Sequence, residues 1–304
     1  MGVEAVEEVV ANPDRVRHRS QRRVDRADAR EEARVDHVQV VELVGTAVGV
    51  QDRAARIGTE PARSDLVGAP GFRYHTLLAH HKEKPTAHNS CCEGQGTRLI
   101  GSLPEHIYSF APDGLYVNLY EPSTVEWNGD GASLKLKMQT RFPFDSDVVL
   151  QFSVARPAQA KIRVRVPSWA KRDMDVYVNG NAAAKGTPGC YVALDRTWSE
   201  GDAIQFRLPI ALSAERYTGL DQIPGHARFA VSYGPILLAA VGAPEVRLRL
   251  DDVKEPADLE KRLKPKSGRP LHFTVENTPG IEFMPYWLVD REPFNCFPAV
   301  PLRA

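Results

Sequence analysis

The sequence predicts a mainly β protein: an antiparallel β-sandwich over residues 110–213, followed by a second β domain over residues 214–304. Three observations carry this prediction. Apolar and polar residues alternate in many short segments from residue 115 onward, turn signals separate these segments, and few stretches show a helical period. A short helical segment, 72–109, precedes the sandwich, and residues 1–71 are expected to be disordered or loosely helical.

The first predicted strands have one apolar face. In "GLYVNLYEPSTVEW" the residues Leu115, Val117 and Leu119 alternate with Tyr116, Asn118 and Tyr120. "ASLKLKMQTRF" alternates Leu, Leu and Met with lysines, and "DVVLQFSV" and "AKIRVRVPSW" follow with the same period. Such alternation is typical of strands that bury one face and expose the other.

Turn chemistry links the later strands. "DVYVNGNAA" is a strand running into an Asn-Gly turn, which is a strong hairpin signal. "GCYVALDRTWSEGDAIQFRLPI" gives two strands around "SEGD", so at least seven short strands are expected between residues 115 and 212, as in an antiparallel sandwich. The second β domain is predicted from "HARFAVSYGPILLAAVG", the helix candidate "PADLEKRLK", "LHFTVEN" and "GIEFMPYWLVDREPF".

Residues 1–71 have an unusual composition. They contain no Phe, Tyr, Trp, Cys or Lys and consist mostly of Val, Ala, Arg, Asp and Glu. Such a segment buries too little apolar surface to offset its ordering entropy. Two interpretations stay open. The segment is a disordered tail, or it is not genuine protein sequence and results from a misplaced start codon or a wrong reading frame. Interleaved acidic residues argue against a basic nucleic-acid-binding arm.

Composition excludes several classes of function. Lys+Arg and Asp+Glu are equal at 39 each, so no overall field favours nucleic acid or an anionic membrane. No apolar run approaches the roughly 20 residues that span a bilayer, and the start lacks a signal-peptide layout, so a cytoplasmic location is the default expectation. Four cysteines do not make a disulfide framework. Cys190 and Cys296 remain a formal possibility for pairing.

The segment "SCCEGQGTRLIGSLPEHIYS" contains the adjacent Cys91 and Cys92 and resembles the segment that closes the catalytic barrel in glycoside hydrolase family 127. "VRVPSWA", "DRTWSEGDAIQFRLPI", "YGPILLAA" and "PYWLVDREPFNCFPAV" resemble further pieces of that family in the same order. The resemblance covers roughly residues 72–304. It implies a retaining β-L-arabinofuranosidase in which an (α/α)6 barrel bears the active site and β domains follow. Residues 72–109 would then be a remnant of the catalytic barrel.

The resemblance also implies roles for the cysteine pair: Cys91 at the nucleophile position and as a zinc ligand, and Cys92 as a second zinc ligand. A cysteine is nucleophilic as its thiolate, and coordination to zinc deprotonates the thiol. A helix predicted just downstream, with Pro104 kinking or restarting it, would assist ionisation. The alternative is that both cysteines are small buried residues at the foot of this helix.

The site is incomplete in this sequence. The family's other zinc ligands, a glutamate and a cysteine, and its acid/base glutamate lie upstream of the pair, where this chain has no cysteine. A makeshift metal site could draw on nearby side chains, although clustered loop histidines are more often solvated: His75, His80, His81, Glu83 and His88. Glu93 is assigned no role. We therefore expect a truncated glycosidase, inactive alone and holding zinc weakly or not at all, whose intact family acts on arabinose-containing glycans.

Two other classes of function stay open. One is a non-catalytic carbohydrate-binding or structural β-sandwich, whose exposed aromatic candidates also fit a core role: Trp127, Trp169, Trp198 and Trp287. The other is a metal or redox site made by Cys91 and Cys92 alone, which is disfavoured because adjacent cysteines lack the usual two-residue spacer. The phosphate-loop, dinucleotide-binding and serine-hydrolase motifs are absent from the sequence.

Overall fold

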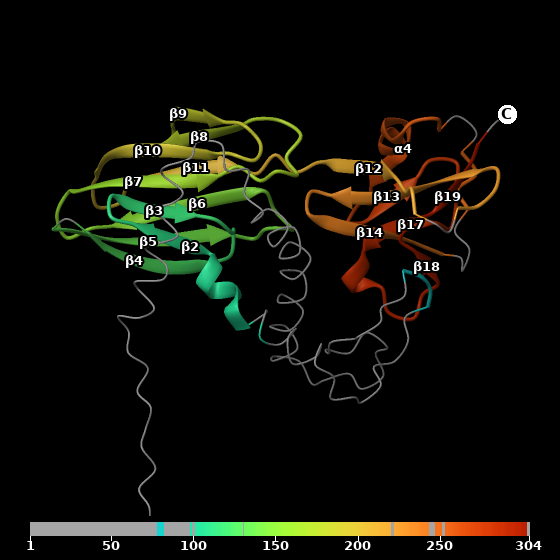
Figure 1. Cartoon of the computed structure of the whole chain (residues 1–304), viewed down its shortest axis with the longest axis horizontal. Coiled ribbons are helices and arrows are strands. Elements are labelled where there is room, and N and C mark those ends of the chain that lie inside the picture. Colours follow the sequence, from blue (N-terminus) through green and yellow to red (C-terminus); the bar gives the residue numbers. More distant parts are fainter. Residues whose placement is uncertain are drawn as a thin grey trace, which may run out of the picture.

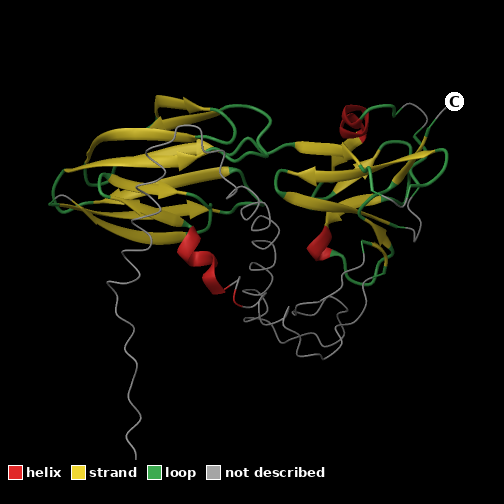
Figure 2. Ribbon diagram, in the orientation of Figure 1, coloured by secondary structure: helices red, strands yellow, loops and turns green. Residues whose placement is uncertain are grey.

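The computed structural model describes residues 78–81, 98, 101–129, 131–219, 222–242, 247–250 and 253–302. Residues 1–71 lie outside this part of the chain, so their interpretation stays a prediction. The predicted mainly β fold is confirmed (Figure 2). Figure 1 shows two lobes, one with strands β2–β11 and one with β12–β19 and helix α4. No helix within the described ranges is long and apolar enough to cross a membrane.

The first lobe contains a four-stranded sheet in the order β10-β7-β3-β2. Its strands are β2 (Tyr108–Ala111), β3 (Gly114–Val117), β7 (Ala158–Arg165) and β10 (Tyr191–Trp198). The β10–β7 and β2–β3 pairs are antiparallel, as predicted. The β3–β7 pair is parallel, because the chain leaves after β3 to build three strands of the other sheet before it returns as β7.

The second sheet of this lobe is antiparallel throughout, in the order β4-β5-β6-β11-β8-β9. Its strands are β4 (Ser123–Gly129), β5 (Ala132–Thr140), β6 (Asp147–Ser153), β8 (Met174–Val178), β9 (Asn181–Gly186) and β11 (Ala203–Arg207). The predicted hairpin joins β8 to β9: Asn179 and Gly180 have φ values of 52° and 78°, the left-handed conformation that this two-residue turn requires.

The apolar faces of the two sheets form one core, as the alternation predicts. Leu134, Leu136 and Met138 are buried, whereas Lys135 and Lys137 are exposed. The prediction for Tyr120 was wrong. It was placed on the polar face, but it is buried and its hydroxyl donates to the Arg165 carbonyl. The strand period ends with β3 at Val117, after which the chain crosses towards β4 in the other sheet.

The second lobe is built on a nine-stranded sheet. Its strands are β1 (Ala79–His80), β12 (Leu212–Arg216), β13 (His226–Tyr233), β14 (Ile236–Val241), β15 (Leu263–Pro265), β16 (Phe273–Val275), β17 (Glu282–Pro285), β18 (Phe294–Asn295) and β19 (Ala299–Pro301). A 3-10 helix, η2 (Tyr286–Leu288), follows β17. A separate apolar core includes Phe229, Leu238 and Phe283.

Helix α4 (Pro256–Arg262) matches the predicted helical segment but ends earlier, because the chain continues directly into β15. The Asp258 carboxylate accepts hydrogen bonds from the backbone N–H groups of Glu255 and Lys254 at the start of the helix. These two bonds lower the pKa of Asp258. Leu259 is fully buried and fixes the helix to the second core.

The two lobes contact each other at defined side chains. Phe144, from the β5–β6 connection, packs against the core of the second lobe. The Lys171 ammonium lies 2.8 Å from Oε1 of Glu260 in α4, and the same oxygen accepts from the backbone N–H of Ala214 at 2.9 Å. One carboxylate therefore joins α4, β12 and the first lobe.

Candidate functional site

The predicted catalytic and zinc-ligand positions, Cys91 and Cys92, lie outside the described residues, as do His75, Glu83, His88 and Glu93. Their predicted roles stay predictions. The structure does describe His80 and His81. The His81 ring donates from Nδ1 to the Arg291 carbonyl oxygen at 3.1 Å.

Both flanks of the cysteine pair are anchored. On the upstream side, β1 pairs with β18, and the Cys296 N–H donates to the Leu78 carbonyl at 2.7 Å. This short segment is the cyan trace in the second lobe of Figure 1. On the downstream side, the predicted helix is present as helical residues 101–102 followed by a 3-10 helix, η1 (Leu103–His106), whose Leu103 is buried in the sandwich core. The sequence between these anchors carries the pair.

The described residues do not complete a zinc site. Within the described part of the chain, no three His, Cys, Asp or Glu side chains gather closely enough to hold a metal ion. Structural zinc takes four ligands, and catalytic zinc takes three protein ligands and a water. Cys190 is exposed and Cys296 is buried, and both are free thiols, so they do not pair with each other. The zinc-ligand roles of Cys91 and Cys92 lie outside this part of the chain and stay predictions.

The tryptophans pack in or against the cores. Trp198 is fully buried, stacks on Phe152 and donates from Nε1 to the Ala160 carbonyl at 2.9 Å. Trp127 is buried and donates to the Ala111 carbonyl at 3.0 Å. Trp169 and Trp287 are half-buried against the first and second cores. Trp127 and Trp198 therefore take the core role that their strand contexts indicated.

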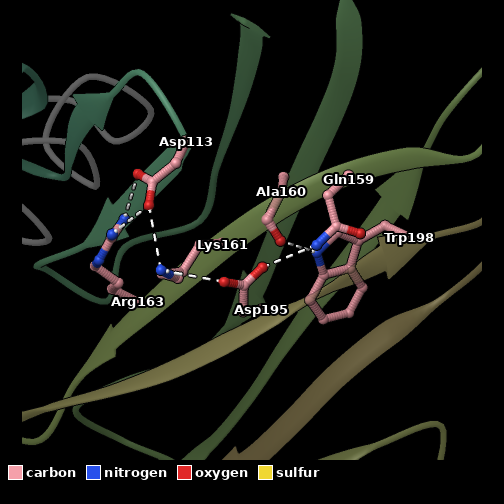
Figure 3. A network of polar contacts seen from close by, with 7 residues as sticks. All are labelled: Asp113, Gln159, Ala160, Lys161, Arg163, Asp195 and Trp198. Atoms are coloured by element: carbon pink, nitrogen blue, oxygen red, sulfur yellow. Dashed lines mark hydrogen bonds and ion pairs between the residues drawn. The ribbon is translucent and has the colours of Figure 1, made fainter. Parts of the chain in front are cut away.

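The outward face of the four-stranded sheet carries a continuous set of polar contacts, which we call the polar strip: Asp113, Gln159, Lys161, Arg163, Asp195 and Thr197. Figure 3 shows these residues except Thr197. Strand alternation places alternate residues of β7 and β10 on this face, and the antiparallel register sets Lys161 opposite Asp195 and Gln159 opposite Thr197. Asp113 reaches the strip from the turn between β2 and β3.

The polar strip is held by mutual bonds. Arg163 donates to both Asp113 oxygens, at 3.1 and 2.7 Å. Lys161 lies 3.4 Å from the Asp113 carboxylate and 3.1 Å from that of Asp195. Gln159 donates to Asp195 at 2.8 Å and accepts from Thr197 at 2.8 Å. Each side chain of the strip thus fixes the position of the next.

The ion pairs of the polar strip shift the pKa values of Asp113 and Lys161. The hydrogen bonds from Arg163 hold the pKa of Asp113 below its ordinary value, with a smaller contribution from Lys161. The pKa of Lys161 is raised, first by its bond to Asp195 and then by its bond to Asp113. Asp113 and Lys161 therefore stay charged across the physiological pH range, and the strip contains two acidic and two basic side chains.

Two tyrosines stand at one end of the polar strip. The rings of Tyr116 and Tyr191 meet edge to face, with centroids 5.2 Å apart and planes at 86°. The Arg163 guanidinium lies over Tyr116 at 4.6 Å from its centroid. The Tyr191 hydroxyl donates to Asn118 Oδ1 at 2.7 Å, yet the residue is 43% exposed. Burial of the hydroxyl end raises the pKa of Tyr191.

This aromatic pair was missed in the sequence analysis because only tryptophans were named as candidate sugar-binding residues. The signal was available: in the strand "YVALDRTW", positions 191, 193, 195 and 197 share the face opposite to the buried Val192 and Leu194. The partner positions on β3 were not derivable, because the parallel β3–β7 register joins segments far apart in sequence.

A hollow of about 560 Å³ adjoins the other end of the strip. Asp113, Gln159 and Asp195 line it together with Ser133, Arg156 and Pro157. A second hollow, of about 550 Å³, lies where Phe144 meets the second lobe, beside Tyr233, Lys266 and Arg269. Lys266 and Arg269 there both pair with Glu282.

The sequence of this chain matches the model of one protein family. Residues 114–210 match the family model described as the GH127 middle domain of β-L-arabinofuranosidase. No curated protein matches the chain. The matched residues begin at β3 and end just beyond Leu208, the last buried residue of the sandwich core.

Three solved structures share the fold. A GH127 β-L-arabinofuranosidase from Geobacillus stearothermophilus T6 is 22% identical, with a TM-score of 0.56 over 77% of this chain and 43% of that chain. A structure described as a glycoside hydrolase is 16% identical, with a TM-score of 0.58 over 76% of this chain and 45% of that one. A GH127 β-arabinofuranosidase is 19% identical, with a TM-score of 0.54 over 77% of this chain and 42% of that one.

This chain spans less than half the length of each of these structures. The family model is matched across the sandwich, and the fold similarity extends over more than three quarters of the chain. The resemblance inferred from the motifs is confirmed: residues 114–210 match the GH127 middle domain, and the wider chain shares its fold with GH127 structures.

Proposed function

We propose that this chain is the C-terminal portion of a glycoside hydrolase acting on arabinose-containing glycans, of the β-L-arabinofuranosidase type. The observation that carries the proposal is the match of residues 114–210 to the GH127 middle domain. The family-like motif around Cys91 and Cys92 stands directly before this domain, in the order that the resemblance predicts.

Cys91 is the proposed nucleophile. In a retaining mechanism its thiolate would attack the anomeric carbon, and a general acid would protonate the leaving oxygen; water would then release the sugar from the thioglycosyl intermediate. The downstream anchor supports this role, because Leu103 and Ile107 in the sandwich core fix the chain shortly after the pair. A zinc ion shared with Cys92 would favour the thiolate, but two sulfurs alone do not make a four-coordinate site.

The 304 residues are proposed to be inactive alone. No cysteine precedes Cys91, and the resemblance to the family does not extend to residues 1–71, so no upstream glutamate is assigned as its acid/base. Loss of general acid–base catalysis costs roughly 10²–10⁴-fold in rate. The purified chain should therefore show no measurable hydrolysis of an aryl β-L-arabinofuranoside and substoichiometric zinc by metal analysis. Turnover lost in Cys91→Ala but kept in Cys190→Ala, an exposed free thiol, would overturn this part of the proposal.

The family role has a separate test. The DNA upstream of the Phe72 codon, read in all frames, should encode barrel helices with a glutamate and a cysteine. A chain in which that frame replaces residues 1–71 should hydrolyse the aryl β-L-arabinofuranoside. Cys91→Ala should abolish the activity and Cys190→Ala should leave it unchanged. Without such a frame, or with activity independent of Cys91, the glycosidase proposal fails.

A further inference from the structure

We propose that the outward face of the sheet β10-β7-β3-β2 binds a neutral oligosaccharide chain, with Tyr191 as the stacking platform and the polar strip as the hydrogen-bonding surface. This site belongs to the middle domain and contains neither cysteine of the pair. It would hold a glycan without cleaving it.

The platform is an exposed but immobilised ring. Tyr191 is 43% exposed, which leaves apolar ring surface open to solvent beside a fixed polar surface. Its edge-to-face contact with Tyr116 and its hydroxyl bond to Asn118 hold the ring in one orientation. Because the side chain is already ordered, little conformational entropy is lost when a ligand packs on it. Sugar rings present C–H groups on one face and hydroxyls at the rim, so a tyrosine beside hydrogen-bonding groups suits them.

The polar strip supplies donors and acceptors in fixed positions. The Asp113 and Asp195 side chains are 48% and 54% exposed even though both are paired. A carboxylate has about four lone-pair sites, so each can accept from a sugar hydroxyl while it keeps its protein partners. Lys161 and Gln159 add donors between them. Exposed ion pairs of this kind contribute little to the stability of the fold. We therefore attribute the fixed geometry of these side chains to ligand recognition.

Charge and length select the ligand class. Within the strip, Asp113 and Asp195 balance Lys161 and Arg163, so its hydrogen-bonding groups carry no net charge, which suits the hydroxyls of a neutral glycan. Two further arginines lie beside the strip: Arg165 opposite Tyr191, and Arg156 in the adjoining hollow. Tyr191 and Thr197 mark the two ends of the proposed binding site on β10 and lie six residues apart, or about 20 Å at the rise of a strand. That span exceeds one sugar ring, so the ligand is an oligosaccharide. The adjoining hollow of about 560 Å³ lies within the size range of ligand pockets.

The test is affinity electrophoresis of the purified 304-residue chain in gels containing a neutral polysaccharide, either soluble arabinan, xylan or dextran. We expect retardation by at least one of these and none by polygalacturonate. Tyr191→Ala should weaken the retardation at least tenfold, and Tyr191→Phe, which keeps the ring, less than threefold. Tyr177→Ala is the matched control, because Tyr177 is 39% exposed on β8 in the other sheet.

Asp195→Asn keeps the size of the side chain and should weaken binding several-fold, which tests the strip independently of the ring. Circular dichroism of each variant confirms that it is folded. Cys91→Ala should bind the polysaccharide as tightly as the wild type. Glycan binding by the sheet and the proposed glycosidase activity are therefore tested independently of each other. Migration unaffected by all three neutral polysaccharides would overturn the proposal. Equal retardation of the wild type and folded Tyr191→Ala and Asp195→Asn would overturn it too.

Discussion

The ring of Trp198 lies parallel to that of Phe152 across the sandwich, with centroids 4.1 Å apart and an interplanar angle of 6°. Trp198 comes from β10 and Phe152 from β6, so the stack ties the two sheets together. Both residues are fully buried.

Trp198→Ala should destabilise the chain by about 3–5 kcal/mol, because it leaves a large cavity between the sheets. It also leaves the Ala160 carbonyl without its indole donor. Trp198→Phe should cost less, since it retains an aromatic contact with Phe152. Urea unfolding followed by circular dichroism measures both variants. Equal stability of Trp198→Ala and wild type would contradict the packing described for this core.

Glu260→Ala should destabilise the chain by about 1–3 kcal/mol, because the N–H of the buried Ala214 loses its acceptor. Lys171→Ala removes only a partly exposed ion pair and should cost less than about 1 kcal/mol. Urea unfolding of the two variants makes the comparison. If Lys171→Ala cost as much as Glu260→Ala, the ion pair rather than the backbone bond would dominate this contact between lobes.

Gly114→Ala should destabilise the first lobe by about 3 kcal/mol or more. Gly114 has a φ of 153°, and a Cβ there would lie 2.0 Å from the Lys161 carbonyl oxygen in the parallel β3–β7 pair. Gly101→Ala is the matched control, since a Cβ at Gly101 meets no atom within 4 Å. Thermal unfolding should show a lower transition temperature for Gly114→Ala and little change for Gly101→Ala.

Asp113→Asn should show a pH-dependent stability difference from wild type. The Arg163 bonds lower the folded-state pKa of Asp113 below 3.8, so the pairing stabilises the fold above that pH. This contribution is lost as the pH falls through the folded-state pKa. Because Asp113 is largely exposed, the difference at neutral pH should stay below about 1 kcal/mol.

Urea unfolding of wild type and Asp113→Asn at neutral pH and at several values below 3.8 measures this difference. Asp175→Asn is the control, since its pair with Lys185 is longer, at 3.9 Å. A difference for Asp113→Asn that persists unchanged at the lowest pH would exclude the carboxylate pairing as its source.

Most strands could be predicted because burial follows the two-residue period in the sequence itself. Leu134, Leu136 and Met138 are buried as their spacing indicates, and Asn179-Gly180 forms its hairpin. The parallel β3–β7 pair and the inward turn of Tyr120 could not be predicted, because both depend on where the chain changes sheets.

The candidate sites, too, could be predicted from the sequence only in part. A family resemblance could name Cys91 and Cys92, but their contacts depend on packing that no local pattern specifies. The polar strip needs the register between β7 and β10, together with an aspartate from a distant turn. Alternation alone places Lys161 and Asp195 on outward faces, and only the pairing of the strands sets them opposite each other.

The pairing of β1 with β18 also bears on the order of folding during synthesis. The buried sandwich core runs from Leu103 to Leu208, so every residue of it has been made before most of the second lobe is translated. Ala79, by contrast, pairs with Asn295, near the far end of the chain. Contacts of such high sequence separation form late and slowly. During synthesis the first lobe can therefore fold while the edge strand upstream of the cysteine pair still lacks its partner.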